Sequence, residues 1–254
     1  MTGPVGTLGG SMDGDRRALV LVHSPLVGPA TWAPTARVLR ARGETVCLPA
    51  TTPPIDCDPP WWRVAAAEVV DAVGDEVGPG RSLVLVGHSA AGPRIPAIGA
   101  ALEEAGHAVV AHLLVDAGMP YADRRPADAL PAEFVDHLAT LVRPDGLLPP
   151  WPEWWPASLL EDLLPDAEQR AAIAAECPAT PRALYDEPVP VPDRWPGTAL
   201  CGYLSFTYED DAAEAQRRGW IVGRAEGHHL QPAVDPDGVA DQIALLLGAL
   251  GVGP

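Results

Sequence analysis

The stretch GHSAAG, residues 87–92, places a serine among small residues directly after an apolar run, SLVLV at 82–86. In the G-x-S-x-G elbow, a strand turns sharply into a helix and raises the serine hydroxyl above the sheet. Small neighbours let the backbone bend that tightly, and Ala91 stands where the pattern has its second glycine. Short motifs also match by chance. Ser89 is therefore either a nucleophile or part of an ordinary tight turn.

A nucleophilic serine needs a donor for the oxyanion and a base, and the sequence offers candidates for both. A helix that begins just beyond Ser89 favours negative charge there, and the backbone N–H of Ala90 is the natural donor to an oxyanion. A serine nucleophile also needs a base. The sequence offers His228 and His229, in AEGHHLQPAVDP at 225–236, between the last expected strand and the last expected helix.

With its serine elbow and late histidine, the chain resembles the α/β-hydrolase superfamily, in which serine, acid and histidine follow in that order. Members of the superfamily carry the catalytic histidine in a G-x-H loop, a few residues before a helix that Asp-Pro opens. His229 meets that spacing, with Gly227 before it and Asp235-Pro236 after it. The resemblance implies that Ser89 is the nucleophile and His229 the base.

The resemblance leaves two positions for the acid that orients the histidine. The commonest position follows the penultimate strand, where this chain has Glu209, Asp210 and Asp211. Haloalkane dehalogenases, which are similar here, place their acid one strand earlier, where Asp116 opens DAGMP with Pro120 four residues on. The acid must be short and held by the scaffold. This requirement favours Asp116 on a core strand, with Glu209 as the second candidate.

The end of the first expected strand, HSPLVG at 23–28, departs from the superfamily pattern. Members usually have His-Gly here, and the next residue donates its N–H to the oxyanion. This chain has Ser24 and then Pro25, which has no N–H. Losing one such donor costs about 3 kcal/mol of transition-state stabilisation. Either the Leu26 N–H or the Ser24 hydroxyl replaces it, or no tetrahedral oxyanion forms. Hydroxynitrile lyases are similar in having a hydroxyl residue here, but the lysine after their histidine is Leu230 in this chain.

Apolar runs that alternate with helical patterns surround these residues. Continuous apolar runs suit strands buried on both faces of a parallel sheet, joined by crossover helices. We expect an α/β fold with a mostly parallel central sheet and helices on both faces. The expected strands lie at 18–23, 44–48, 82–86, 109–115, 198–206 and 220–224, and the expected helices at 31–42, 61–77, 95–105, 211–218 and 239–250.

The alternation stops between 120 and 196, where prolines are frequent and only 132–142 and 166–176 have helical patterns. A stretch of about 75 residues is too long for a structureless loop, so we expect a helical cap inserted between two strands. The expected division is a disordered N-terminus at 1–17, a core at 18–119 and 197–254, and a cap at 120–196.

The expected cap is rich in aromatic residues, with PPWPEWWP at 149–156. Trp151, Trp154 and Trp155 either line an apolar substrate pocket or form a small core of the cap itself. Arg94, just past the elbow, either reaches a substrate carboxylate or is solvated at the surface.

Composition excludes several classes of partner. The 254 residues have a net charge of −17, which repels nucleic acid and anionic membranes. There is no apolar run near 18 residues and no apolar core in the N-terminal stretch, so we expect neither a membrane span nor a secretory signal. Four cysteines without CxxC spacing favour free thiols in a reducing cytoplasm and no metal site. No nucleotide-binding motif indicates a cofactor, and no feature indicates an oligomeric state.

These features favour an enzyme that acts on a mostly apolar small molecule. One hypothesis is a serine hydrolase of an ester, thioester or lactone, in which Ser89 attacks and His229 moves the proton. The other is elimination, lyase or cyclisation chemistry of secondary metabolism, with His229 as general base. A non-catalytic receptor on the same fold is disfavoured, because a receptor would not require a serine, a histidine and an acid together.

Overall fold

The computed structural model describes residues 17–122 and 124–252. Its main sheet has six strands in the order β2-β1-β3-β4-β7-β8, and all neighbouring pairs are parallel. The strands are β1 (Ala18–Val22), β2 (Thr45–Cys47), β3 (Ser82–His88), β4 (Ala108–Val115), β7 (Leu200–Ser205) and β8 (Ile221–Arg224). The expected α/β class with a mostly parallel sheet is confirmed.

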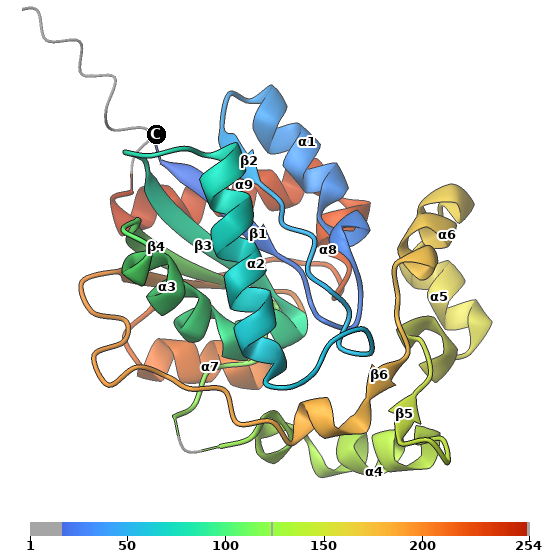
Figure 1. The fold of residues 1–254 in the computed structure, drawn as a ribbon. Coiled ribbons are helices and arrows are strands. Elements are labelled where there is room, and N and C mark those ends of the chain that lie inside the picture. Colours follow the sequence, from blue (N-terminus) through green and yellow to red (C-terminus); the bar gives the residue numbers. More distant parts are fainter. Residues whose placement is uncertain (1–16, 123, 253–254) are drawn as a thin grey trace, which may run out of the picture.

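Helices cover both faces of this sheet (Figure 1). One face carries α2 (Trp61–Glu76), α3 (Ile95–Glu104) and α7 (Glu209–Arg217), and the other carries α1 (Ala33–Ala41) and α9 (Pro236–Leu250). A short helix that was not expected, α8 (Gln231–Val234), precedes α9. Among the described residues, no helix is long and apolar enough to cross a lipid bilayer.

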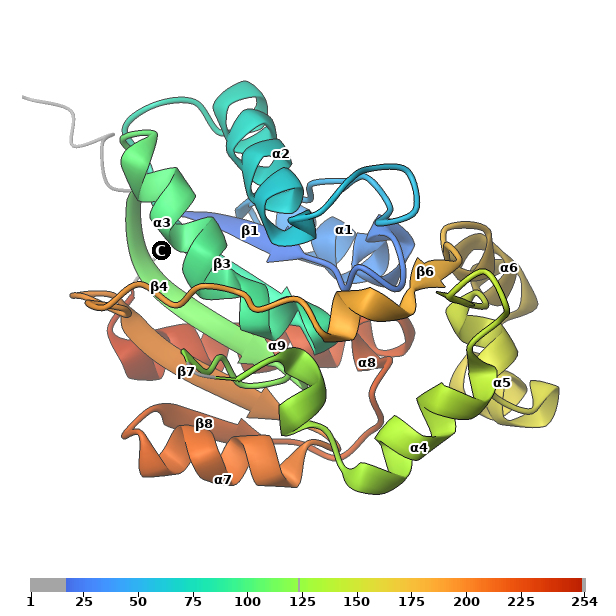
Figure 2. The same ribbon diagram turned by 60° about the horizontal axis from the view of Figure 1, so that its bottom comes forward.

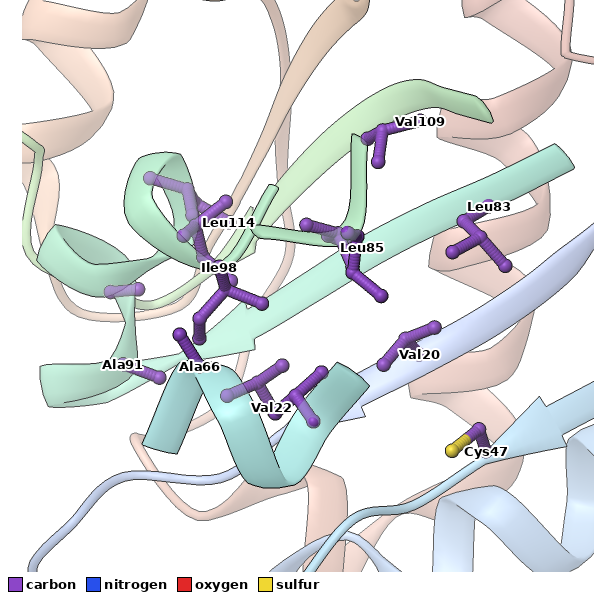
Figure 3. Packing of buried hydrophobic residues seen from close by; sticks show 14 of the residues in the cluster. Val20, Val22, Cys47, Ala66, Leu83, Leu85, Ala91, Ile98, Val109 and Leu114 are labelled. Carbon is purple, nitrogen blue, oxygen red and sulfur yellow. The ribbon is translucent and has the colours of Figure 1, made fainter. Parts of the chain in front are cut away.

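Successive strand residues point to opposite faces and fill two separate apolar clusters. Val20 and Leu85 are buried with Ala66 of α2 and Ile98 of α3 (Figure 3), whereas Leu19 is buried on the face of α1 and α9. Because both faces are covered, the strands are apolar throughout. This explains why unbroken apolar runs, and not alternating patterns, mark them in the sequence.

The chain between β4 and β7, which we call the inserted segment (residues 120–196), forms short elements beyond the carboxyl ends of the strands (Figure 2). They include α4 (Ala132–Leu141), α5 (Ala157–Leu163), α6 (Ala167–Ala175) and an antiparallel pair of β5 (Leu147–Leu148) and β6 (Thr180–Pro181). The helical patterns predicted α4 and α6. They missed α5 and the strand pair, because seven and two residues are too short to show a period.

The expected disorder of residues 1–17 lies outside the described residues, except at Arg17. The Arg17 side chain is buried, forms an ion pair with Glu44 at 2.7 Å and donates to the carbonyl of Val252. Arg17 therefore connects the start of β1 to the segment before β2 and to the end of the chain after α9.

The turn after β3 packs closely against the turn after β4. A Cβ at Gly92 would lie 2.1 Å from the carbonyl oxygen of Gly118, and one at Gly87 would lie 2.6 Å from Ile95. In return, Gly118 N–H donates to the carbonyl of Ser89 at 3.2 Å. The glycines of the GHSAAG stretch are therefore required by the close approach of neighbouring atoms as well as by the bend.

Replacing Gly92 with alanine should lower the free energy of unfolding by about 2 kcal/mol, because two backbone turns must separate to admit the methyl group. Gly248→Ala in α9 is the matched control, since an added Cβ there has no heavy atom within 4 Å other than those of its neighbours and of its own helix backbone. It should raise the free energy of unfolding by up to about 1 kcal/mol. Urea unfolding followed by circular dichroism measures both changes. An unchanged midpoint for Gly92→Ala would contradict the tight packing.

Candidate active site

Ser89 occupies the first position of the turn that follows β3. Its φ is +59°, in the left-handed region that residues other than glycine rarely adopt. The conformation arises where β3 reverses sharply into the 3-10 turn Ser89–Arg94, and such strain is typical of functional sites. The Ser89 Oγ lies 2.9 Å from Nε2 of His229. The serine hydroxyl is therefore raised above the sheet and directed at an imidazole.

The imidazole of His229, in the loop between β8 and α8, is held from three directions. Its Nδ1 lies 2.8 Å from Oδ2 of Asp116. The ring of Tyr208 stacks on it with centroids 4.9 Å apart and planes 8° apart. From below, Nε2 of His88 donates to the carbonyl oxygen of His229 at 2.8 Å. With a carboxylate at Nδ1, the neutral ring carries its proton on Nδ1 and presents Nε2 as acceptor to Ser89.

Asp116 follows β4 and is fully buried, with a φ of +42°. Its Oδ1 accepts the backbone N–H groups of Phe206, Thr207 and Tyr208 at 2.9, 2.7 and 3.0 Å, and Oδ2 accepts the Thr207 hydroxyl at 2.6 Å. Burial alone would raise the pKa of Asp116. The hydrogen bond and charge of His229, together with the Thr207 bonds, outweigh burial and hold that pKa well below its usual range. The carboxyl group is therefore ionised.

The structure brings Asp116 to His229 and leaves the second acid candidate elsewhere. Glu209, in the first turn of α7, has a side chain that is 64% exposed and forms an ion pair with an arginine of β8 at 3.2 Å. Asp211 accepts the backbone N–H of Met119 at 2.9 Å, and burial raises its pKa. Glu209 thus forms a surface ion pair at the start of α7, and Asp211 holds the loop that follows Asp116 through a hydrogen bond.

The two other histidines near the site have structural partners. His228 accepts the N–H of Leu230 at Nδ1 within its own loop, at 3.2 Å. His88 is buried at the end of β3, and burial, with the neighbouring charge of His229, lowers the pKa of His88 to about 3. A neutral His88 supports the backbone of His229. The sequence pattern did not reveal the roles of His88, Thr207 and Tyr208, because they depend on which strands become neighbours.

The region opposite His229 has hydroxyl and backbone donors. The buried Ser24 accepts the Leu26 N–H at its Oγ, at 3.3 Å, so its own O–H remains to be donated elsewhere. Ala90 is the second residue of a 3-10 turn, where an N–H has no acceptor within the helix. Pro25, Leu26 and Ala90 line one narrow cavity. Of the two substitutes for the missing N–H of Pro25, Leu26 lines this cavity, and Ser24 lies next to it in the chain without lining the cavity.

The three tryptophans of the inserted segment pack into an apolar cluster that also contains Leu26 and Leu230 of the sheet end. Trp154 is buried, donates from Nε1 to a backbone carbonyl at 2.7 Å and contacts Phe134. Trp155 stacks on a histidine of α4, and Trp151 is half-buried at the edge of the cluster. The residues that line the narrow cavity do not include them. This packing favours the interpretation that they form a core beneath the inserted segment.

One of the two sequence interpretations placed Arg94 in solvent at the surface, and the structure shows that this interpretation is wrong. The Arg94 side chain is 7% exposed and lines the same narrow cavity as Ala90. Burial lowers the pKa of Arg94 to about 10, against the opposing effect of the Glu187 charge. The guanidinium is therefore still protonated at neutral pH.

Comparison with known proteins identifies the fold by structure alone. No family model and no curated protein matches the sequence. An extracellular α/β-hydrolase from a Paenibacillus species, described as sharing structural and functional homology with tobacco salicylic acid binding protein 2, has a TM-score of 0.69 at 17% identity. That match covers 91% of this chain and 98% of the other.

Two further solved structures match similarly. Polyneuridine aldehyde esterase has a TM-score of 0.67 at 16% identity, covering 90% of this chain and 98% of its own. A variant of tomato methylketone synthase I, complexed with β-ketoheptanoate, has a TM-score of 0.65 at 14% identity, covering 92% and 98%. Similarity at these identities establishes the arrangement of strands and helices that the chain shares with these proteins.

Asp116→Asn should lower the free energy of unfolding at pH 7 by about 2 kcal/mol, because the ionised carboxylate is stabilised by the fold. A group with a depressed folded pKa stabilises above its unfolded pKa, about 3.9 for aspartate, and that stability is lost as the pH falls towards the folded pKa. The difference between wild type and variant should therefore be present from pH 5 to 8 and shrink below about pH 4. Urea unfolding across this range measures it. Glu209→Gln is the exposed control and should follow the wild type, and a difference that grew below pH 4 would contradict the assignment.

Proposed function

Because this chain has the α/β-hydrolase fold, we propose that it is a serine hydrolase. Its substrate is an ester, thioester or lactone of a mostly apolar small molecule. The observation that carries the proposal is the hydrogen-bonded series of Ser89, His229 and Asp116, with contacts of 2.9 and 2.8 Å. An esterase among the structural neighbours supports it. The reaction requires no cofactor.

The proposed nucleophile is Ser89. Its hydroxyl proton passes to Nε2 of His229 as Oγ attacks the carbonyl carbon of the substrate. The carboxylate of Asp116 holds the Nδ1–H tautomer and stabilises the imidazolium that forms. The imidazolium then protonates the leaving alcohol or thiol, which leaves an acyl group on Ser89. Water, deprotonated by His229, releases the acid and restores the serine.

We assign the oxyanion donors to the Ala90 N–H and the Ser24 hydroxyl. The Leu26 N–H acts indirectly. It donates a hydrogen bond of 3.3 Å to Ser24 Oγ, and this bond orients and polarises the serine hydroxyl. Pro25 has no N–H and cannot donate to the oxyanion, so the Ser24 hydroxyl donates that hydrogen bond instead.

Tyr208 is a positioning residue in this mechanism. Its ring covers one face of His229. Burial, together with the charge of Asp116, raises the pKa of Tyr208 to about 12. The phenol therefore stays protonated, and its ring shields the imidazole from water while leaving both nitrogens in contact with their partners.

The oxyanion region also favours a second candidate function. Pro25 has no N–H and the Leu26 N–H is already donated to Ser24. An elimination, lyase or cyclisation reaction, with His229 as general base, does not require a tetrahedral adduct on Ser89. The presence of a methylketone synthase among the structural neighbours is consistent with such chemistry. Under this candidate Ser89 and Ser24 bind the substrate by hydrogen bonds.

Covalent labelling separates the two candidates. A fluorophosphonate probe should label wild-type protein at Ser89, and p-nitrophenyl acetate should give a burst of nitrophenol equal to the enzyme concentration. Ser89→Ala should lose both signals, whereas Ser158→Ala, at an exposed serine of α5, should keep them. Folded protein that takes up no label would overturn the hydrolase proposal. Ester turnover without a labelled serine would support general-base chemistry by His229.

Ser24→Ala should reduce kcat for a model ester by about 100-fold, because one oxyanion donor is lost, and should leave KM nearly unchanged. Steady-state kinetics with p-nitrophenyl butyrate measure both constants. Ser24→Thr, which keeps the hydroxyl, is the control and should retain more activity than the alanine variant. A kcat for Ser24→Ala equal to that of the wild type would remove Ser24 from the oxyanion site.

A further inference from the structure

Arg94 is a buried cation without an ion-pair partner. Its side chain is 7% exposed, and no carboxylate among the described residues lies within ion-pairing distance of it. Other buried or half-buried arginines of the chain are paired, as Arg17 is with Glu44 and Arg218 is with Glu214. The N–H groups of Arg94 therefore have no carboxylate acceptor among the described residues.

Glu187 is the carboxylate whose charge acts most strongly on Arg94, and its oxygens already accept hydrogen bonds from the start of α2. Glu187 accepts the N–H of Trp61 at 2.6 Å and that of Trp62 at 3.2 Å, which are the first two residues of α2. Its charge raises the pKa of Arg94 from beyond ion-pairing distance. Glu187 thus keeps the guanidinium protonated without occupying its N–H groups.

Arg94 lines a narrow cavity that also borders Ala90, one of the two proposed oxyanion donors. Leu26 and Tyr185 line it as well, and its other walls are prolines, a leucine and a valine. The free space is about 20 Å³, room for about one water molecule, so a carboxylate that reaches Arg94 must displace side chains that line the cavity. Between Ser89 and Arg94 the chain advances by five residues of 3-10 geometry, or about 10 Å at 2.0 Å per residue. A short substrate chain spans that distance.

The position of the cavity selects the acyl side of the substrate. The leaving group must lie next to Nε2 of His229, because that atom gives it a proton. Neither His229 nor Tyr208 lines the cavity, whereas Ala90, whose N–H is a proposed oxyanion donor, does. A substituent in the cavity therefore belongs to the acyl portion and not to the departing alcohol or thiol.

We propose that Arg94 binds a carboxylate on the acyl portion of the substrate, so that the enzyme cleaves half-esters or half-thioesters of short dicarboxylic acids. A planar guanidinium fork matches a carboxylate with two parallel hydrogen bonds. A chain with a net charge of −17 repels anions at long range, so an anionic substrate requires a dedicated cation at the site. The inference rests on the proposed function for the reaction, but the binding of the carboxylate can be tested without it.

Binding is tested in the Ser89→Ala variant by titration calorimetry with glutarate and with its uncharged isostere, glutaramide. Glutarate should bind at least about tenfold more tightly. Adding Arg94→Met should abolish this preference, and Arg94→Lys should keep part of it. Arg143→Gln, which removes an exposed arginine of the inserted segment that is paired with Glu153, is the charge-matched control and should keep it fully.

Equal affinity for glutarate and glutaramide in Ser89→Ala would overturn the inference, even if the Arg94 variants failed to fold. A preference that survived Arg94→Met in folded protein would overturn it as well. Turnover gives an independent readout. Two esters are compared: the mono-p-nitrophenyl ester of glutaric acid, and the same ester with its free carboxylate converted to a primary amide. The ratio of kcat/KM for the first ester to kcat/KM for the second should be about ten or more in the wild type and should approach one in Arg94→Met. If the wild type hydrolyses neither ester, the proposed function fails, while the titration still decides the role of Arg94.

Discussion

A carboxylate removed from water is the constraint on which the site depends. Asp116 has no solvent exposure, yet it is ionised, so every lone pair of its oxygens needs a donor. Three consecutive backbone N–H groups after β7, a threonine hydroxyl and the imidazole of His229 provide them. Meeting that requirement joins the ends of β4 and β7 to the loop after β8. It also carries Tyr208 onto the face of His229. The position of the imidazole, and with it the partner of Ser89, thus follows from the solvation of one buried charge.

The parts of the fold that the sequence predicts are those with a strong local pattern. Unbroken apolar runs located the strands, and the G-x-H spacing drew attention to His229, which the structure places beside Ser89. The preference for Asp116 over Glu209 came from its expected place on a core strand. The donors around its carboxylate could not be predicted, because they depend on β4 and β7 being neighbours with Val115 opposite Leu204. That register sets Asp116 beside the backbone of residues 206–208. The elements α5, β5 and β6 were likewise beyond prediction, since their lengths are too short to show a period.

The burial of Arg94 also could not be predicted from the local sequence pattern. Arg94 lines a cavity together with Leu184, Tyr185 and Val189 of the inserted segment, which lie about 90 positions away in a proline-rich stretch without periodicity. The proposed oxyanion donors are likewise far apart in the sequence, because Ser24 follows β1 and Ala90 follows β3. The site thus combines an ionised carboxylate, Asp116, with a buried cation, Arg94, in a chain whose net charge is −17. In the proposed function, Asp116 stabilises the imidazolium and Arg94 binds the anionic acyl group of the substrate.

The central claim is that Asp116 acts through His229 on Ser89 and that Glu209 does not. It is tested most directly by comparing kcat for p-nitrophenyl butyrate in Asp116→Asn and Glu209→Gln, each checked for native circular dichroism. Loss of the carboxylate that fixes the imidazole tautomer should reduce kcat by about 10⁴-fold. Glu209→Gln, whose side chain lies on the surface of α7, should retain the wild-type kcat. Full activity in Asp116→Asn together with loss of activity in Glu209→Gln would contradict the account.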